Sequence, residues 1–475
     1  MSKITKNYIY NLLYQLFVLL VPVITAPYLA RVLGANNQGV SSYIISISNV
    51  IGSITMLGIF SYGNRQIAYE RDDKEKMSQT FWEIMIVRFI LGIIGSALYF
   101  FVALKLTDYT QYFFIYYFWL LATYVDCTWV FVGVEDMKLA VIKNFIAKLL
   151  TVIGMFIFIK NSDDINKYLL ILGLSVLIAN LSAYIQLRKY ILKPIIDFNN
   201  IKKHILGSIN LFLPYVATLL YLQVDKIMIE VFTNTTNQVS FYDNAEKIVT
   251  IPLAFITVLS TVMMPRIANE YLKNNLTNIK NYLIKAGRIS LFLAFPMTIG
   301  IMIIASKFIP WYLGHEFLPV ISAIVFISPM IISNSLEGIA GRQYFTATNQ
   351  IPILLKSYIS TAITNIIVNI ILIPKWGFIG AAIATLISSY ICVLIQFYYL
   401  NKQINMMGLI PYSIRYLIYS LIMGTVVYLL SKNLEASPIT TVIQILSGGS
   451  IYLFICFINK DSILKEIIDK IKGYL

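Results

Sequence analysis

The chain alternates long apolar runs with short polar gaps. Runs of about 20 apolar residues, the length that crosses a bilayer as an α-helix, recur from one end of the sequence to the other. We place them near residues 8–33, 39–62, 80–104, 111–133, 139–159, 168–187, 207–232, 239–264, 288–310, 316–341, 351–373, 377–400, 411–430 and 440–458. The pattern predicts an all-α polytopic membrane protein with about 14 transmembrane helices.

The charges support this map and orient it. Only 13% of the 475 residues are charged and 58% are hydrophobic, whereas soluble proteins carry about 25% charged residues. The net charge of +14 does not indicate a nucleic-acid partner, because the basic residues are scattered through short gaps. With the amino terminus inside, 26 of the 37 Lys and Arg residues lie in inner segments and seven in outer ones. The positive-inside rule then predicts that both termini are cytoplasmic.

Nothing in the sequence indicates an enzyme or a cofactor. The three cysteines and two histidines show no spacing typical of a metal site or a disulfide framework. No GxxxxGK[ST] phosphate loop is present, and no polar gap is large enough for a catalytic domain. The two longest gaps, 188–204 and 268–287, predict short helices on the membrane surface, and the tail after residue 459 predicts an amphipathic surface helix.

Four sets of matching residues indicate an internal duplication. "NNQGVSSY" at 36–43 returns as "TNQVSFY" at 236–242, and "NRQIAYE" at 64–70 as "PRIANEY" at 265–271. Lys143 matches Lys356, and Gln186 matches Gln396, at offsets of 210 to 213. Because six spans separate the copies, both enter the membrane in the same orientation, which predicts two parallel six-helix lobes around a central cavity. The predicted domains are an N-terminal lobe (1–190), a cytoplasmic connecting loop (191–206), a C-terminal lobe (207–401), two additional helices (402–459) and a cytoplasmic amphipathic tail (460–475).

Polar side chains follow single faces of several spans. In the seventh span, Asn210, Pro214, Thr218, Tyr221 and Asp225 form one stripe, and Lys226 lies about 100° away from it. Further polar or charged candidates lie inside other spans: Asn49, Arg88, Asp126, Lys148, Asp243, Glu246, Lys247, Glu337, Asn365 and Asn369. Ser, Thr and Asn groups often only hold membrane helices together. A charge at the bilayer centre costs about 2.5 to 3.5 kcal/mol even on the most lenient scale, so the charged groups favour a functional cavity.

Six passages resemble landmarks of one family. They are "ARVLGANNQG", "CTWVFVGVED", "VDKIMIE", "YDNAEKI", "MMPRIANEY" and "PKWGFIGAAIATLIS". Together they are similar to the Wzx-type polysaccharide-biosynthesis oligosaccharide flippases of the multidrug, oligosaccharidyl-lipid and polysaccharide exporter superfamily. The resemblance covers the first twelve spans. It implies movement of an undecaprenyl-diphosphate-linked oligosaccharide repeat unit from the inner to the outer leaflet by alternating access, in a bacterial plasma membrane, for capsule or other surface polysaccharide. A polysaccharide polymerase and chain-length machinery are implied as further partners.

The residues and the resemblance together suggest roles. Lys148, Lys226, Lys247 and Arg88 would bind the diphosphate, and Asn49, Asn365 and Asn369 the sugars, since cations and amides pair well with these groups. Asp126, Asp225, Asp243, Glu246 and Glu337 would balance charge or couple transport to H⁺ or Na⁺. Three alternatives stay open: a drug/cation antiporter of the same superfamily, a flippase for the peptidoglycan lipid precursor, and a membrane enzyme, for which the loops are too short.

Overall fold

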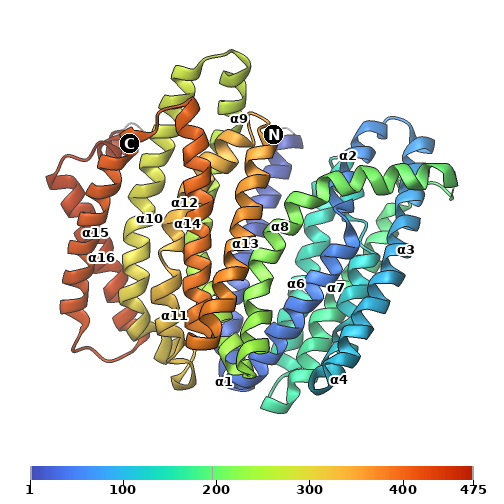
Figure 1. The fold of residues 1–475 in the computed structure, drawn as a ribbon, viewed down its shortest axis with the longest axis horizontal. Coiled ribbons are helices and arrows are strands. Elements are labelled where there is room, and N and C mark those ends of the chain that lie inside the picture. Colours follow the sequence, from blue (N-terminus) through green and yellow to red (C-terminus); the bar gives the residue numbers. More distant parts are fainter. Residues whose placement is uncertain (1–2, 195, 473–475) are drawn as a thin grey trace. The chain divides into compact units, whose positions relative to one another are not determined.

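The computed structural model describes residues 3–194 and 196–472. Within these ranges, the side chains of 3–16, 18, 19, 137, 140, 210, 211, 213–222, 258, 259, 261, 262, 467 and 470–472 are outside the description. All regular structure in the described residues is helical (Figure 1). The chain forms two compact units: unit 1 is 1–230 with 235–240, and unit 2 is 231–234 with 241–475.

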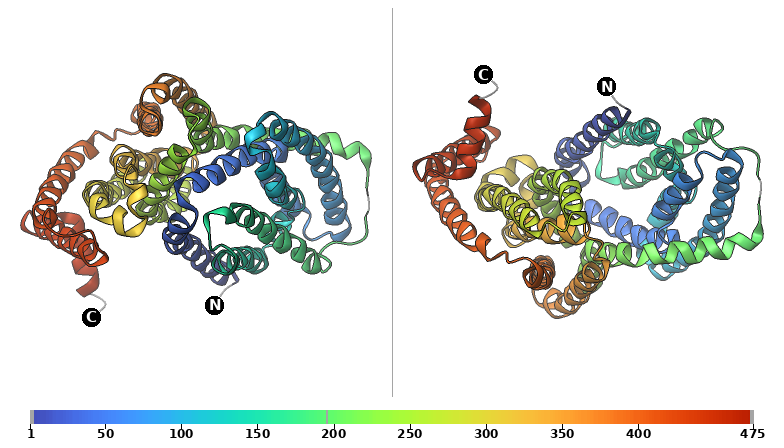
Figure 2. Two further views of the ribbon diagram at one scale, coloured as in Figure 1. Left: turned by 90° about the horizontal axis from the view of Figure 1, so that it is seen from below. Right: turned by 90° about the horizontal axis from the view of Figure 1, so that it is seen from above.

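The described residues of unit 1 form eight α-helices, the last of which continues three residues into unit 2. They are α1 (Lys3–Met56), α2 (Ile59–Glu70), α3 (Lys74–Lys105), α4 (Thr110–Tyr124), α5 (Thr128–Gly133), α6 (Met137–Phe158), α7 (Ile165–Leu187) and α8 (Ile201–Thr233). α1 joins the first two predicted spans across a kink at Gly34, whose φ of 73° favours glycine. The segment between α7 and α8 runs along one edge of unit 1 (Figure 2). It ends in a 3₁₀ turn, η3 (Phe198–Asn200).

The apolar core of unit 1 lies in two layers. One layer is built around Phe81 of α3, Trp129 of α5 and Ile67 of α2. The other is built around Tyr99 of α3 and Phe113 of α4, with residues from α1 and α7. Because α3 and the α4–α5 pair contribute to both layers, the residues midway along these helices lie between them. Arg88, midway between Phe81 and Tyr99 along α3, and Asp126, between α4 and α5, lie at that intermediate level.

Unit 2 contains nine α-helices and one π-helix. They are α9 (Thr236–Leu272), α10 (Leu276–Tyr312), α11 (Val320–Ile327), α12 (Met330–Glu337), the π-helix η5 (Gly338–Phe345), α13 (Ile351–Trp376), α14 (Phe378–Gln403), α15 (Ile410–Ser431), α16 (Pro438–Ile458) and α17 (Ser462–Lys472). The first residues of α9, up to Ser240, belong to unit 1. α17 is the predicted amphipathic tail helix, and its Ile463 is buried.

The predicted fold class is confirmed. Eleven helical segments of the described residues are long and apolar enough to cross a membrane, and the first of them, Leu20–Glu70, includes two predicted spans. The helices α8 and α9 coincide with the predicted spans at 207–232 and 239–264. The protein is therefore an all-α, multi-pass membrane protein, and the count of 14 stays a prediction.

Two expectations about the polar gaps were wrong. No separate surface helices form at 268–287, because α9 continues to Leu272 and α10 already begins at Leu276. In the described part of 188–200 the chain has only the 3₁₀ turn before α8. The first part of α8 lies across the ends of other helices of unit 1 (Figure 1). Unit 1 includes most of α8, so the boundary between the units falls after residue 230, whereas the predicted C-terminal lobe begins at residue 207. The two lobes stay a prediction from the sequence repeats.

Candidate functional site

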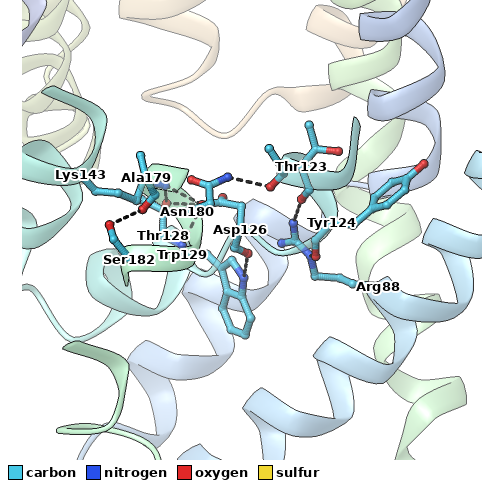
Figure 3. Close-up of polar contacts among 11 residues, drawn as sticks. Arg88, Thr123, Tyr124, Asp126, Thr128, Trp129, Lys143, Ala179, Asn180 and Ser182 are labelled. Atoms are coloured by element: carbon cyan, nitrogen blue, oxygen red, sulfur yellow. Dashed lines mark hydrogen bonds and ion pairs between the residues drawn. The ribbon is translucent and has the colours of Figure 1, made fainter. Parts of the chain in front are cut away.

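A break in the fourth predicted span of unit 1 creates a polar centre (Figure 3). α4 ends at Tyr124 and α5 begins at Thr128, so residues 125–127 leave backbone groups without helical partners. The side chain of Asn180 in α7 donates to the Ala122 carbonyl at 2.7 Å. The indole of Trp129 donates to the Asp126 carbonyl at 3.2 Å. The break is therefore held by side chains from neighbouring helices.

Arg88 belongs to this polar centre and is almost completely buried. Its guanidinium donates to the Tyr124 carbonyl at 3.2 Å and to the Thr123 carbonyl. Both acceptors lie at the end of α4, where a cation also interacts favourably with the helix dipole. In the described structure the Arg88 donors contact the backbone of α4. The predicted contact of Arg88 with a diphosphate stays a prediction.

The carboxylate of Asp126 forms the centre of an ion pair. It accepts a hydrogen bond from Lys143 Nζ of α6 at 2.7 Å, and others from the backbone N–H and the hydroxyl of Thr128. Lys143 is 7% exposed, and its ammonium also donates to the Thr128 hydroxyl. Removing one member would leave a buried charge without compensation.

Lys143 was missing from the predicted site, where Lys148 was proposed from the same helix. In the structure Lys148 is half-buried, five residues further along α6. A usable signal was present, because Lys143 is one of the residues that recur in the second half of the chain. Asn49, on α1, is also half-buried. The roles predicted for Lys148 and Asn49 stay predictions.

The charged pair that interrupts α8 has two different environments. Asp225 is 1% exposed, whereas Lys226 is half-buried. This agrees with the predicted angle between neighbouring residues of a helix. The side chains of Asn210, Pro214, Thr218 and Tyr221, which complete the predicted stripe, lie outside the described residues.

In α9, an ion pair links successive turns. Lys247 Nζ lies 2.5 Å from a carboxylate oxygen of Asp243. The Asp243 side chain is 6% exposed, but that of Lys247 is 53% exposed. Glu246 is half-buried beside them. Lys247 therefore combines a fixed position with an accessible ammonium group.

Unit 2 holds a second buried carboxylate at a helix irregularity. Glu337 is the last residue of α12, directly before the π-helix η5. It accepts from Arg342 Nε at 3.1 Å and from the Tyr358 hydroxyl at 2.7 Å. The Arg342 side chain is 49% exposed. Short π-helical segments are frequent at functional sites, and this one places a half-exposed guanidinium beside a buried acid.

Asn365 and Asn369 lie in the interior of unit 2. Both are fully buried in α13, and the Asn369 amide donates to the Asn365 carbonyl oxygen at 3.1 Å. The structure thus brings these two predicted sugar-binding residues together, one turn apart. Their contact supports helix packing, and binding to sugars stays a prediction.

Sequence reasoning also missed a buried histidine. His204 in α8 lies 2.8 Å from a carboxylate oxygen of Glu83 in α3, and its other ring nitrogen lies 2.9 Å from the Tyr62 hydroxyl of α2. Glu83 also accepts from the Asp197 backbone N–H and the Asn200 amide. These contacts tie the segment before α8 to α3. A lone histidine in the sequence gave no signal, because its partners lie more than 100 residues away.

A cavity of about 620 Å³ lies within unit 2, between α9, α10, α15 and α16. Ile251, Phe255, Met297 and Leu453 are among its lining residues, and no charged side chain is. Such a lining suits hydrocarbon and lacks the cations that a phosphate group requires. The charged candidates lie elsewhere.

Comparison with known proteins identifies the family. A profile of the family "Polysaccharide biosynthesis protein" matches residues 4–271, more than half of the chain. The chain belongs to the polysaccharide biosynthesis protein family. A profile of "Lipid II flippase MurJ" matches residues 145–446 and overlaps with it. The predicted resemblance is therefore confirmed, and this family member is a transporter rather than an enzyme.

Two relatives of this polysaccharide biosynthesis protein are described as a transporter and a flippase. The "Putative O-antigen transporter" of Escherichia coli K12 is 23% identical over 389 residues, which cover 80% of this chain and 92% of the relative. The "Probable low-salt glycan biosynthesis flippase Agl15" of Haloferax volcanii is 24% identical over 185 residues, 39% of each chain.

Solved structures show the same fold. The lipid II flippase MurJ in an inward closed conformation has a TM-score of 0.71 at 18% identity, covering 96% of this chain and 100% of that one. An inward-facing multidrug resistance transporter has a TM-score of 0.64 at 15% identity, covering 81% and 93%. At these identities the likeness concerns the fold alone.

Proposed function

We propose that this protein moves an undecaprenyl-diphosphate-linked oligosaccharide from the inner to the outer leaflet of a bacterial plasma membrane, for capsule or other surface polysaccharide. The observation that carries the proposal is the family match, together with an O-antigen transporter relative that aligns over 92% of its own length. On this proposal both termini are cytoplasmic, and a polymerase with its chain-length machinery receives the product.

The accessible cations supply a chemical basis for binding. Lys247 and Arg342 each lie beside a buried carboxylate and are about half-exposed, so a diphosphate can take the place of the carboxylate as their partner. Lys226 and Lys148 are half-buried candidates for the same role. Arg88 and Lys143, in contrast, are buried on the α4–α5 break and hold unit 1 together. Charge-assisted contacts to phosphate are strong where water is scarce.

Alternating access of two related lobes is the proposed mechanism. The repeats in the sequence and the fold shared with solved flippases and antiporters support it. An inside-negative membrane potential favours outward movement of an anion by about 2.3 kcal/mol per charge per 100 mV. Asp225 and Asp243, which are buried in α8 and α9, stay candidates for charge balance during the return step.

The proposal is tested by deleting the gene and restoring it as wild type, Lys247→Ala or Lys226→Ala, followed by mass analysis of lipid-linked intermediates. We expect the deletion strain and both variants to accumulate the undecaprenyl-diphosphate oligosaccharide on the cytoplasmic leaflet, at unchanged protein abundance. Lys432→Ala, at an exposed position after α15, is the matched control and should restore export. Normal surface polysaccharide in both lysine variants would contradict the proposed diphosphate contacts.

A second candidate function has specific support. The match of residues 145–446 to the lipid II flippase profile, and the fold likeness to that flippase, favour a peptidoglycan precursor as an alternative cargo. Loss of viability in the deletion strain under all growth conditions, with accumulation of the peptidoglycan precursor, would support this candidate. A drug/cation antiporter shares the fold only, and changed drug susceptibility in the deletion strain would indicate it.

A further inference from the structure

The most unusual acidic group in unit 1 is Glu230, in the last turn of α8. Its side chain is buried, with 6% of the residue exposed. One carboxyl oxygen, Oε1, accepts a hydrogen bond from the Tyr109 hydroxyl. The other oxygen, Oε2, is buried and has no hydrogen-bond partner among the described residues. A buried carboxyl with only one hydrogen bond requires an explanation.

The surroundings of Glu230 supply phenol groups and no cation. Tyr109, in the turn η1 (Thr107–Tyr109) before α4, packs against Tyr43 of α1 with ring centroids 5.2 Å apart. Tyr43 is 2% exposed and also interacts electrostatically with Glu230. Among the described residues, Asp108 also acts electrostatically on Tyr109, and it is itself acidic. Within the described part of unit 1, no Lys, Arg or His forms an ion pair with Glu230.

Three other acids of the protein that are buried or half-buried differ from Glu230 in this respect. Asp126 is paired with Lys143, Glu83 contacts His204, and Glu337 is paired with Arg342. An ionised carboxylate in an apolar protein interior is costly unless a cation or several donors compensate it. A neutral carboxylic acid with one unmade hydrogen bond costs much less. The site therefore favours the protonated form of Glu230.

We propose that Glu230 is a proton-binding site, protonated while α8, η1 and α1 are packed as described. A metal cation fits less well, because it requires several oxygen ligands and only Tyr109 offers a hydrogen-bonded oxygen beside the carboxyl. Release of the proton would place an unpaired negative charge between Tyr109 and Tyr43. Such a charge attracts water and weakens the packing of α8 on α1 and η1.

The position of Glu230 links its protonation to the packing of nearby helices. At the same end of unit 1, the Thr236 hydroxyl at the start of α9 donates to the Asn36 side chain of α1. A side chain at Gly39 would lie 1.8 Å from the Thr236 carbonyl oxygen, so the backbones of α1 and of the first residue of α9 are in close contact. Binding of a proton by Glu230 would stabilise this closed arrangement, and its release would favour separation. Coupling of that step to lipid transport rests on the proposed function.

Infrared difference spectroscopy of the purified protein in lipid nanodiscs tests the site itself. We expect the wild type at neutral pH to show a carboxylic acid C=O band that is lost in Glu230→Gln. Tyr109→Phe should shift the band, because it removes the hydrogen bond to Oε1. The matched control Glu435→Gln, at an exposed position, should keep the band. An unchanged band in Glu230→Gln would overturn the proposal, and loss of the wild-type band on adding NaCl but not choline chloride would replace the proton with Na⁺.

A transport measurement tests the coupling separately. In vesicles with an imposed pH gradient, the rate at which the wild type moves an undecaprenyl-diphosphate oligosaccharide should change with the gradient. The rate for Glu230→Gln should not change, while Glu435→Gln should behave like the wild type. An equal response of Glu230→Gln would overturn the coupling. If the infrared band behaves as expected but no variant and no wild type moves an undecaprenyl-diphosphate oligosaccharide, the proton site stands and the proposed function fails.

Discussion

Each half of the chain has a carboxylate at an irregularity in its fourth predicted span, and the two carboxylates differ in how exposed their paired cation is. Asp126 lies in the break between α4 and α5, and Glu337 lies at the junction of α12 and η5. Glu337 follows Asp126 by 211 residues, within the offset of the internal repeat. The cation of Asp126 is the buried Lys143, whereas that of Glu337 is the half-exposed Arg342.

This difference in exposure distinguishes an ion pair that holds helices together from one whose cation can leave its carboxylate for another anion. A buried pair cannot change partner without leaving a charge unpaired in the interior, so the Asp126 pair fixes the helices of unit 1. A half-exposed guanidinium can turn to water or to a new anion at little cost. At corresponding positions of the predicted repeat, we therefore expect a structural ion pair in the first half and a candidate binding group in the second.

The largest expected effect is on stability in the first half. Asp126→Ala leaves Lys143 and Arg88 without their acidic neighbour, so we expect a loss of about 3–5 kcal/mol in the free energy of unfolding. Thermal unfolding in detergent measures it. The double variant Asp126→Leu/Lys143→Met, which removes both charges, should recover most of the loss. Glu337→Ala should cost clearly less, and equal losses for the two acids would contradict the comparison.

The next effect is on transport in the second half. Arg342→Ala removes the half-exposed cation, so we expect a loss of stability within about 1 kcal/mol but a strong decrease in export of lipid-linked oligosaccharide. Arg342→Lys keeps the charge and should restore part of the export. Full export by Arg342→Ala, measured from surface polysaccharide at matched abundance, would show that this cation is not part of the binding site.

Two glycines test the packing around each irregularity. A side chain at Gly133 would lie 2.9 Å from the Asn64 backbone oxygen and 2.6 Å from Ile67, whereas at Gly341 it would meet the end of the Glu337 carboxylate at 2.5 Å. We expect Gly133→Ala to lower the free energy of unfolding by about 1–3 kcal/mol, because the backbone at Asn64 cannot move aside. Gly341→Ala should cost less and mainly disturb the contact of Glu337 with Arg342. The reverse order of the two unfolding temperatures would count against this account.

The smallest expected effect is the pH dependence of helix capping, which differs between the two halves of the chain. Asp73 caps α3, and hydrogen bonds from the backbone N–H and side chain of Lys76 lower its pKa below the ordinary 3.8. The corresponding third span of the second half, α10, is capped by Asn275, which does not titrate. Because the pKa of the folded state is lowered, the stabilisation by Asp73 is complete above pH 3.8 and is lost as the pH falls through the lowered value.

Hydrogen exchange at acidic pH measures this difference. Amides of the first turn of α3 should lose protection relative to their values at neutral pH, after correction for the intrinsic rate, while those of the first turn of α10 should not. Asp73→Asn, which keeps an acceptor for the cap, should abolish the pH dependence at α3. Parallel loss of protection at both helices would show that the cap is not responsible.

The sequence was sufficient for the fold because membrane spans are encoded locally. Hydropathy placed most spans along single helices of the structure, whereas the predicted spans at 39–62, 111–133 and 316–341 are each divided between two or more helical segments. The same signals failed for the polar gap at 268–287, where helix propensity carries α9 and α10 beyond the apolar runs. The family resemblance came from short motifs and was confirmed by a match over residues 4–271.

The site was less predictable because burial and pairing depend on tertiary contacts. Asp126, Asp225 and Glu337 were identified from their positions in apolar runs. Asp225 and Glu337 are buried, and the Asp126 side chain is 21% exposed. Lys143, Arg342 and His204 were left out of the predicted site. Lys143 pairs with Asp126 in the α4–α5 break, Arg342 reaches Glu337 from the π-helix η5, and His204 contacts Glu83 of a distant helix. Glu230 was missed for a related reason: only the structure shows that its carboxyl has phenols and no cation around it.

The most direct test of the account is flipping of undecaprenyl-diphosphate oligosaccharide in reconstituted vesicles, with the wild type, Lys247→Ala, Arg342→Ala and the double variant Asp126→Leu/Lys143→Met compared at equal protein. The account predicts that the double variant moves the lipid to the opposite leaflet at near the wild-type rate, and that Lys247→Ala and Arg342→Ala lose most of it. Normal flipping by both single variants, with loss in the double variant, would contradict the assignment of exchangeable and structural cations.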